Sequence, residues 1–345
     1  MHAQKLKWLK TKNDTAYISD LTKDLTVRTF LANKFTQYSL GDYAYKSKIS
    51  YKANDNYNIG VGINYKYIGI NLGFKMPFVN NDTLKYGTTK FFDLQSFVYL
   101  RKITLDLYVL SYNGYYLASR SMLNTLPTQN IFPHRADLRT RNIGLNGQYI
   151  FNSKRFSFRS AYLQNEYQRK SAGSAIVGAG LHGISVRADS AIIPVDLKYD
   201  PYFGNSTFTR SSITSLSLNA GYAHTFVIKR NYFITAALLG GPGINYTTIK
   251  GDPNNDPTGK LSLQLNGIIR LAAGYSSTGY FVGMQYINFI NRVNAPFDGT
   301  WQEYQTGNVR FTLAKRFKLK KKTRNKINKI ENKIKTELGI PNGTK

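Results

Sequence analysis

The sequence contains no cysteine, only four histidines, and 19 acidic against 47 basic residues. The absence of cysteine excludes a disulfide scaffold, a thiolate metal site and thiol catalysis. The four histidines (His2, His134, His182 and His224) stand far apart, not at metal-ligand spacing. Glycine motifs that bind phosphate or a dinucleotide are also missing. The sequence therefore predicts no metal, no cofactor and, as the simplest expectation, no enzyme.

Long apolar runs are missing as well. No stretch of about 18 apolar residues occurs, which excludes a transmembrane helix. A β-barrel is the one membrane-spanning structure that needs no such run, because its strands face lipid with alternate residues only.

The chain does contain segments in which apolar residues alternate with polar residues or glycine. In residues 58–76, apolar side chains such as Ile59 and Val61 alternate with Gly, Asn or Lys, and the pattern continues in step across residues 66–67. A two-residue turn at that place would put both apolar faces on the same side of a hairpin. Residues 88–113, 138–168 and 260–290 repeat the pattern.

These hairpins predict an all-β, antiparallel, up-and-down transmembrane β-barrel over residues 25–317. A soluble β-sandwich also alternates, but its apolar faces must fill a packed core. The clear strands are odd in number, so a further strand is expected at residues 194–202, which gives 14. The alternative is 12, with residues 25–40 and 194–202 outside the barrel. The strands expected are 25–40, 57–66, 67–77, 88–101, 102–113, 138–151, 155–168, 174–188, 194–202, 211–228, 231–248, 260–275, 279–290 and 305–317.

The two ends of the chain differ from the barrel. Residues 1–24 contain no apolar core of a signal peptide, but Ala3 before Gln4 resembles a cleavage site, so we expect a signal peptide upstream and export. Residues 318–345 change to a helical period and form a basic amphipathic tail, solvated or bound to a membrane surface or a periplasmic partner.

The formal net charge of +28 is typical of nucleic-acid-binding proteins. Much of the positive charge lies at the end of the last expected strand and beyond it, between residues 315 and 335. No recognition helix or RNA-binding motif accompanies it. We therefore expect outer-membrane lipid, and not nucleic acid, as the partner of this chain.

Residues 58–67, 68–77, 138–149 and 164–173 carry a family resemblance. They resemble an uncharacterised family of outer-membrane-type β-barrel proteins of Bacteroidetes-like Gram-negative bacteria, classed only as a domain of unknown function. The similarity covers about residues 20–317. It implies a barrel in the bacterial outer membrane and brings no assigned ligand or catalytic residue.

The inner face of the expected barrel is polar and mostly basic. The residues expected to face the lumen are Lys66, Lys75, Asp93, Arg101, Asp106, Arg159 and Arg270. Charges inside a barrel set ion preference, so these side chains favour passage or binding of small anionic solutes in a porin-like lumen. The alternative is that they pair with one another and close the barrel, which then has a structural role.

Two further hypotheses remain. A membrane-embedded lipid hydrolase would need a nucleophile beside a base, but the odd spacing of His182 and Ser185 puts them on opposite faces of one strand. An anchor for a periplasmic partner would act through the basic tail.

Overall fold

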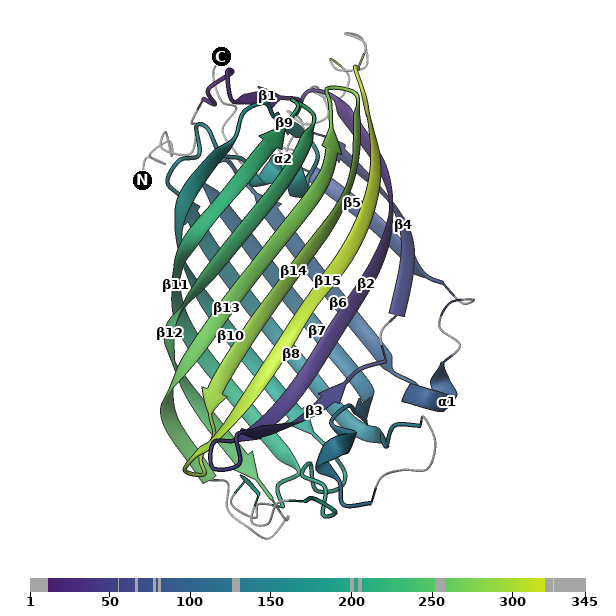
Figure 1. The fold of residues 1–345 in the computed structure, drawn as a ribbon, viewed down its shortest axis with the longest axis vertical. Coiled ribbons are helices and arrows are strands. Elements are labelled where there is room, and N and C mark those ends of the chain that lie inside the picture. Colours follow the sequence, from purple (N-terminus) through teal and green to yellow (C-terminus); the bar gives the residue numbers. More distant parts are fainter. Residues whose placement is uncertain are drawn as a thin grey trace.

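The computed structural model describes residues 12–54, 56–65, 68–76, 79, 82–125, 131–198, 202–203, 207–251, 258–319 and 325. They form an antiparallel barrel of tilted strands (Figure 1). The strands are β1 (Ile18–Asp20), β2 (Leu25–Asp42), β3 (Ser47–Lys52), β4 (Asn56–Tyr65), β5 (Ile68–Lys75), β6 (Lys90–Tyr99), β7 (Ile103–Leu117), β8 (His134–Ile150), β9 (Glu166–Gln168), β10 (Ala172–Arg187), β11 (Arg210–Ile228), β12 (Tyr232–Lys250), β13 (Thr258–Ser276), β14 (Tyr280–Asn294) and β15 (Thr300–Phe317).

The helical segments are short. They are α1 (Thr83–Tyr86), the 3-10 helix η2 (Arg120–Met122) and α2 (Phe158–Tyr162). Within the described residues, we find no helix of the length and apolar character needed to span a membrane.

Ten strands close the ring of the barrel. Their spatial order is β15, β14, β13, β12, β11, β10, β8, β7, β3 and β2, and β2 pairs back onto β15. The closing ladder is long, running from Leu25 opposite Phe317 to Asp42 opposite Thr300. Closure in this way pairs the edges that an open sheet would leave exposed.

The wall between β2 and β7 is built differently at its two ends. At one end β3 joins β2 to β7. At the other end β4 pairs with β2 and β5 pairs with β4, while β6 pairs with β7. Over the described residues β5 and β6 are not paired with each other. We call the line between them the seam.

The two rims of the barrel differ in their connections. Short turns follow β6, β11 and β13, and Leu25 and Phe317 lie at this rim, which we call the turn end. The opposite rim carries longer connections, such as residues 118–133 and 188–209, and we call it the loop end.

Alternation decides which side chains point outward. On β12, Tyr232, Ile234, Leu238, Ile244 and Tyr246 are all exposed, whereas Thr235, Ala237 and Asn245 between them are buried. The same apolar outer face recurs on β4, β11 and β13. Because a soluble protein does not expose a continuous apolar band of this size, the outer surface is the one expected of a barrel in lipid.

Two expected strands are wrong. Residues 155–168 do not form a barrel strand: they contain α2, which is buried, and β9, which pairs with β1 in a separate two-stranded sheet. Of residues 194–202, the described part makes only an isolated bridge from Leu197 to Leu123. Strands β10 and β11 pair antiparallel without it, so no further strand was needed.

The expected total of 14 barrel strands is therefore wrong for the described residues. The main sheet has 13 strands, of which ten close the ring. The alternative of 12 left out residues 25–40, but these form β2 within the ring. The short strand β3 was not expected. The basic tail lies outside the described residues, apart from residues 318–319 and 325.

Candidate functional site

The connection from β8 to β10 includes a buried helix near the turn end. It turns inward as α2, whose first turn is capped by the side chain of Ser157, and every residue of α2 is buried. The barrel wall binds its backbone: Gln285 Nε2 donates to the Ala161 carbonyl at 2.6 Å and Arg316 Nε to the Gln164 carbonyl at 2.6 Å. We call residues 152–168 the plug.

A buried carboxylate fixes the plug. Glu166 accepts from Arg101 at the β6–β7 turn, from Arg159 of α2 at 3.2 Å, and from the Ser157 hydroxyl at 2.5 Å. Arg101 is thus paired at the rim. Arg159, expected on the wall, belongs to the plug itself, because residues 155–168 are not a wall strand.

A second ion pair crosses the lumen. Arg270 on β13 and Asp106 on β7 lie 2.5 Å apart, and both side chains are fully buried. Arg270 also donates to the Tyr99 hydroxyl at 2.8 Å, and its guanidinium packs against the rings of Phe158 and Phe289. This cluster joins opposite walls and α2.

Asp93 and Lys75, which were also expected to face the lumen, belong neither to the plug nor to the Arg270 cluster. Asp93 on β6 pairs with Lys34 of β2 at 2.7 Å and also accepts from the Tyr112 hydroxyl. Lys75 on β5 is exposed, and Lys66 lies outside the described residues.

A cavity of about 320 Å³ lies between the plug and the seam, and residues of both line it. It is lined by Arg28, Asn71, Leu94, Gln95, Ser96, Phe97, Tyr99, Tyr162, Leu163, Gln285, Ile287, Asn308 and Arg310. The lining contains two guanidinium groups, four side-chain amides and no carboxylate. Its two formal charges are therefore both positive.

Arg28 is held by three amide oxygens. It donates to Gln164 at 2.6 Å, to Asn64 at 2.9 Å and to Asn71 at 2.9 Å. The side chain reaches Asn71 across β4 because residue 62 is glycine: a Cβ there would lie 2.7 Å from Arg28 Nε and 2.3 Å from Asn71 Oδ1. These oxygens are neutral, so the charge of Arg28 stays uncompensated.

Arg310 has even fewer partners. Its guanidinium lies over the ring of Phe30 at 4.7 Å, and its buried Nε has no hydrogen-bond partner among the described residues. The inner face of β15 brings it to the same cavity as Arg28 of the neighbouring strand. Two cations thus share one recess without an anion.

Sequence reasoning singled out neither arginine as a principal site residue. The inner face of β2 reads Thr26, Arg28, Phe30, Ala32 and Lys34, opposite the apolar Val27 and Leu31. This alternation could have placed Arg28 in the lumen. Its lack of a carboxylate partner depends on the tertiary structure.

The groups considered for hydrolysis do not come together. His182 is buried in the lumen, where it stacks on Tyr108 and contacts Asn146 Oδ1 at 3.3 Å. Ser185, three residues along β10, points to the other face. Among the described residues no group of three acidic or histidine side chains could hold a metal ion.

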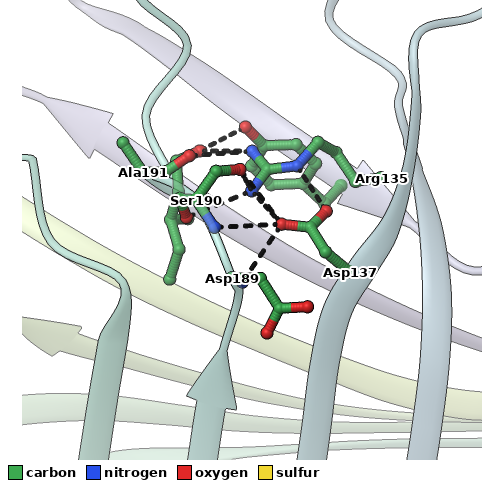
Figure 2. A network of polar contacts seen from close by, with 7 residues as sticks. Arg135, Asp137, Asp189, Ser190 and Ala191 are labelled. Carbon is green, nitrogen blue, oxygen red and sulfur yellow. Dashed lines mark hydrogen bonds and ion pairs between the residues drawn. The ribbon is translucent and has the colours of Figure 1, made fainter.

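A polar network lies at the loop end (Figure 2). Arg135 binds both carboxylate oxygens of Asp137 at 2.9 Å, and the backbone amides of Asp189 and Ser190 donate to Asp137 as well. These hydrogen bonds, led by that of Arg135, hold the pKa of Asp137 well below its usual range. The network ties residues 189–191 to the part of β8 beyond the apolar band, which ends at Ile143.

Solved structures with a similar architecture are outer-membrane proteins. The protease OmpT of Escherichia coli is 10% identical, with 87% of this chain and 98% of that chain covered and a TM-score of 0.39. The toluene transporter TodX of Pseudomonas putida is 8% identical, covering 90% and 95%, with a TM-score of 0.23. OpdQ of Pseudomonas aeruginosa is 7% identical, covering 85% and 98%, with a TM-score of 0.22. These values are too low to bear on activity or ligand.

No curated protein matches the chain. A family model described as a domain of unknown function, DUF4421, matches residues 12–317. The expected resemblance to an uncharacterised family is therefore confirmed, and the chain belongs to the DUF4421 family.

Proposed function

We propose that this protein is an outer-membrane β-barrel with a closed lumen that binds a small anionic solute between Arg28 and Arg310. The observation that carries the proposal is the cavity of about 320 Å³, which contains both guanidinium groups and no carboxylate. Its volume is at the lower end of the range for small-molecule sites.

Electrostatics favours an anion at this place. An uncompensated cation in a recess of low dielectric is costly, and a bound anion would offset that cost. A guanidinium presents several N–H donors in a plane, which suits the two oxygens of a carboxylate or phosphate. The buried Nε of Arg310 has no hydrogen-bond partner among the described residues, and Arg28 is already oriented by Asn64, Asn71 and Gln164.

Binding is favoured over free passage because the lumen is filled at two levels. The plug closes the turn end, and the Arg270–Asp106 pair with its aromatic neighbours lies further inside. In bacterial barrels short turns face the periplasm, so we place the plug on the periplasmic side. A periplasmic partner for the basic tail remains a separate proposal.

The test is calorimetric titration of the full chain in a non-ionic detergent with hexanoate and with the uncharged hexan-1-ol. We expect hexanoate to bind more tightly, and Arg310→Met to weaken it about tenfold or more, the effect of losing charge-assisted hydrogen bonds. Arg139→Met is the matched control, because that arginine is exposed on the outer face of β8. Equal binding of hexanoate and hexan-1-ol, or no effect of Arg310→Met, would contradict the proposal.

A further inference from the structure

The seam is an unpaired break within the apolar band. Most neighbouring strands of the ring form long ladders, such as β12 with β13, but over the described residues β5 pairs only with β4 and β6 only with β7. Lipid offers no hydrogen bonds to an open strand edge, so such an edge is tolerated only where it borders protein, water or a bound polar ligand. A break at this depth therefore indicates an opening whose strand edges border water or a bound polar ligand.

The cavity reaches this opening. Its lining takes four consecutive residues of β6, from Leu94 to Phe97. Successive residues of a strand point to opposite faces, so Gln95 and Phe97 face the lumen while Leu94 and Ser96 face outward. Leu94 is 48% exposed, in line with the outward Phe92 and Val98. A recess lined by consecutive residues of β6 follows this strand, whose other edge is the seam.

The two flanks of the seam are apolar on the outside. Leu72 and Phe74 on β5 are 58% and 63% exposed, and Phe92 on β6 is 59% exposed. Inside the seam the surface changes to arginine and amide side chains together with Phe97, Tyr162 and Ile287. The surface therefore changes across the seam from apolar side chains that face lipid to the two arginines of the cavity.

Ion pairs bound the seam at both ends. Towards the loop end, Lys34 of β2 reaches past the end of the β4–β5 hairpin to Asp93 of β6. Towards the turn end, Arg101 after β6 is fixed to Glu166 of the plug. The opening between these pairs has a defined extent along β6.

We infer that the cavity is entered sideways from the membrane, and that its ligand is a single-chain amphiphile with an anionic headgroup. The headgroup binds Arg310 and Arg28, and the chain lies through the seam, between the outer faces of β5 and β6. This inference rests on the proposed function and adds the route of entry and the class of ligand.

The test uses the full chain in phosphatidylcholine vesicles that contain hexadecanoic acid with a photoreactive diazirine midway along its chain. We expect cross-links at residues 94–97, reduced about tenfold or more by Arg310→Met and unchanged by Arg139→Met. The matched probe is the corresponding alcohol, which lacks the charge and should not label these residues.

A thiol assay gives an independent readout, because the natural chain has no cysteine. Ser96→Cys places one thiol at the edge of the seam, and Ala179→Cys places one on the outer face of β10, away from it. Added hexadecanoate should slow alkylation of the Ser96→Cys protein by N-ethylmaleimide and leave the Ala179→Cys protein unaffected.

The outcomes separate the two proposals. If hexanoate binds through Arg310 but hexadecanoate labels residues 94–97 no more than the alcohol does, sideways entry is overturned and the anion site stands. If labelling of the seam is the same with and without Arg310, the amphiphile contacts only the outer face, and the inference is overturned as well. If neither hexanoate nor hexadecanoate binds, both proposals fail.

Discussion

Arg270 on β13 and Asp106 on β7 form an ion pair across the lumen, and neither side chain has any exposed surface. The two strands stand on different parts of the ring, so the pair braces the wall from inside. Tyr99, Phe158 and Phe289 surround the guanidinium and exclude water from it.

Removing one member of this pair should destabilise the barrel. Arg270→Met leaves Asp106 buried without its cation, a change that costs about 3–5 kcal/mol in comparable buried pairs. The free energy of unfolding is measured by urea titration in detergent, with tryptophan fluorescence and gel mobility as readouts. The double variant Arg270→Met, Asp106→Leu should recover most of the loss. A single variant as stable as the natural protein would contradict this role.

The plug should open when its carboxylate is removed. Glu166→Ala leaves Arg101 and Arg159 close together without the anion between them, which loosens α2 from the rim. In planar bilayers we expect little or no steady conductance from the natural protein and frequent open events from the variant. Glu303→Ala, which removes a carboxylate paired with Arg292 at the loop end, is the control and should stay closed. Equal conductance of all three proteins would argue against the plug as a barrier.

Anion binding should depend on the glycine beneath Arg28. Gly62→Ala changes no charge, but its Cβ would meet Arg28 Nε and Asn71 Oδ1, so the guanidinium must move. We expect hexanoate affinity to fall by about the worth of one charge-assisted hydrogen bond, roughly tenfold. The control is Gly183→Ala on β10, where a Cβ would meet nothing within 4 Å. The interpretation fails if both alanine variants bind hexanoate like the natural protein.

The loop-end network should resist acid. Asp137 has a pKa depressed chiefly by its hydrogen bond from Arg135, so its stabilising effect is complete above the unfolded value of about 3.9 and is lost as the pH falls through the lower folded value. Asp137→Asn should therefore lower the unfolding temperature at pH 7 and at pH 5, and the difference from the natural protein should shrink only below about pH 4. A difference that vanishes already at pH 5 would contradict the depressed pKa.

Sequence patterns predicted the hairpins well because alternation is local. The pattern of residues 58–76 fixes both the register of β4 with β5 and the face that meets lipid, as the pairing of Val61 with Leu72 shows. The plug was mistaken for a strand because Phe156, Phe158 and Tyr162 lie at even spacing, which a strand and a short buried helix share.

The site depends on relationships that a single strand does not reveal. Arg101, Asp106, Arg159 and Arg270 were expected to line a path for anions, but each of them lies in an ion pair. Arg101 and Arg159 share Glu166, and Arg270 pairs with Asp106. Arg28 and Arg310 are distinctive because no carboxylate reaches them. The seam, likewise, depends on whether β5 and β6 meet when the barrel closes, which alternation within either strand does not determine.

The membrane location of the barrel is tested by fractionation of the natively exported protein, with gel mobility compared before and after boiling. We expect recovery in the outer membrane and a clear mobility shift on boiling, because a closed barrel stays folded in detergent until it is heated. Recovery as a soluble protein without detergent, with no mobility shift, would contradict the membrane barrel and with it the anion site and the seam.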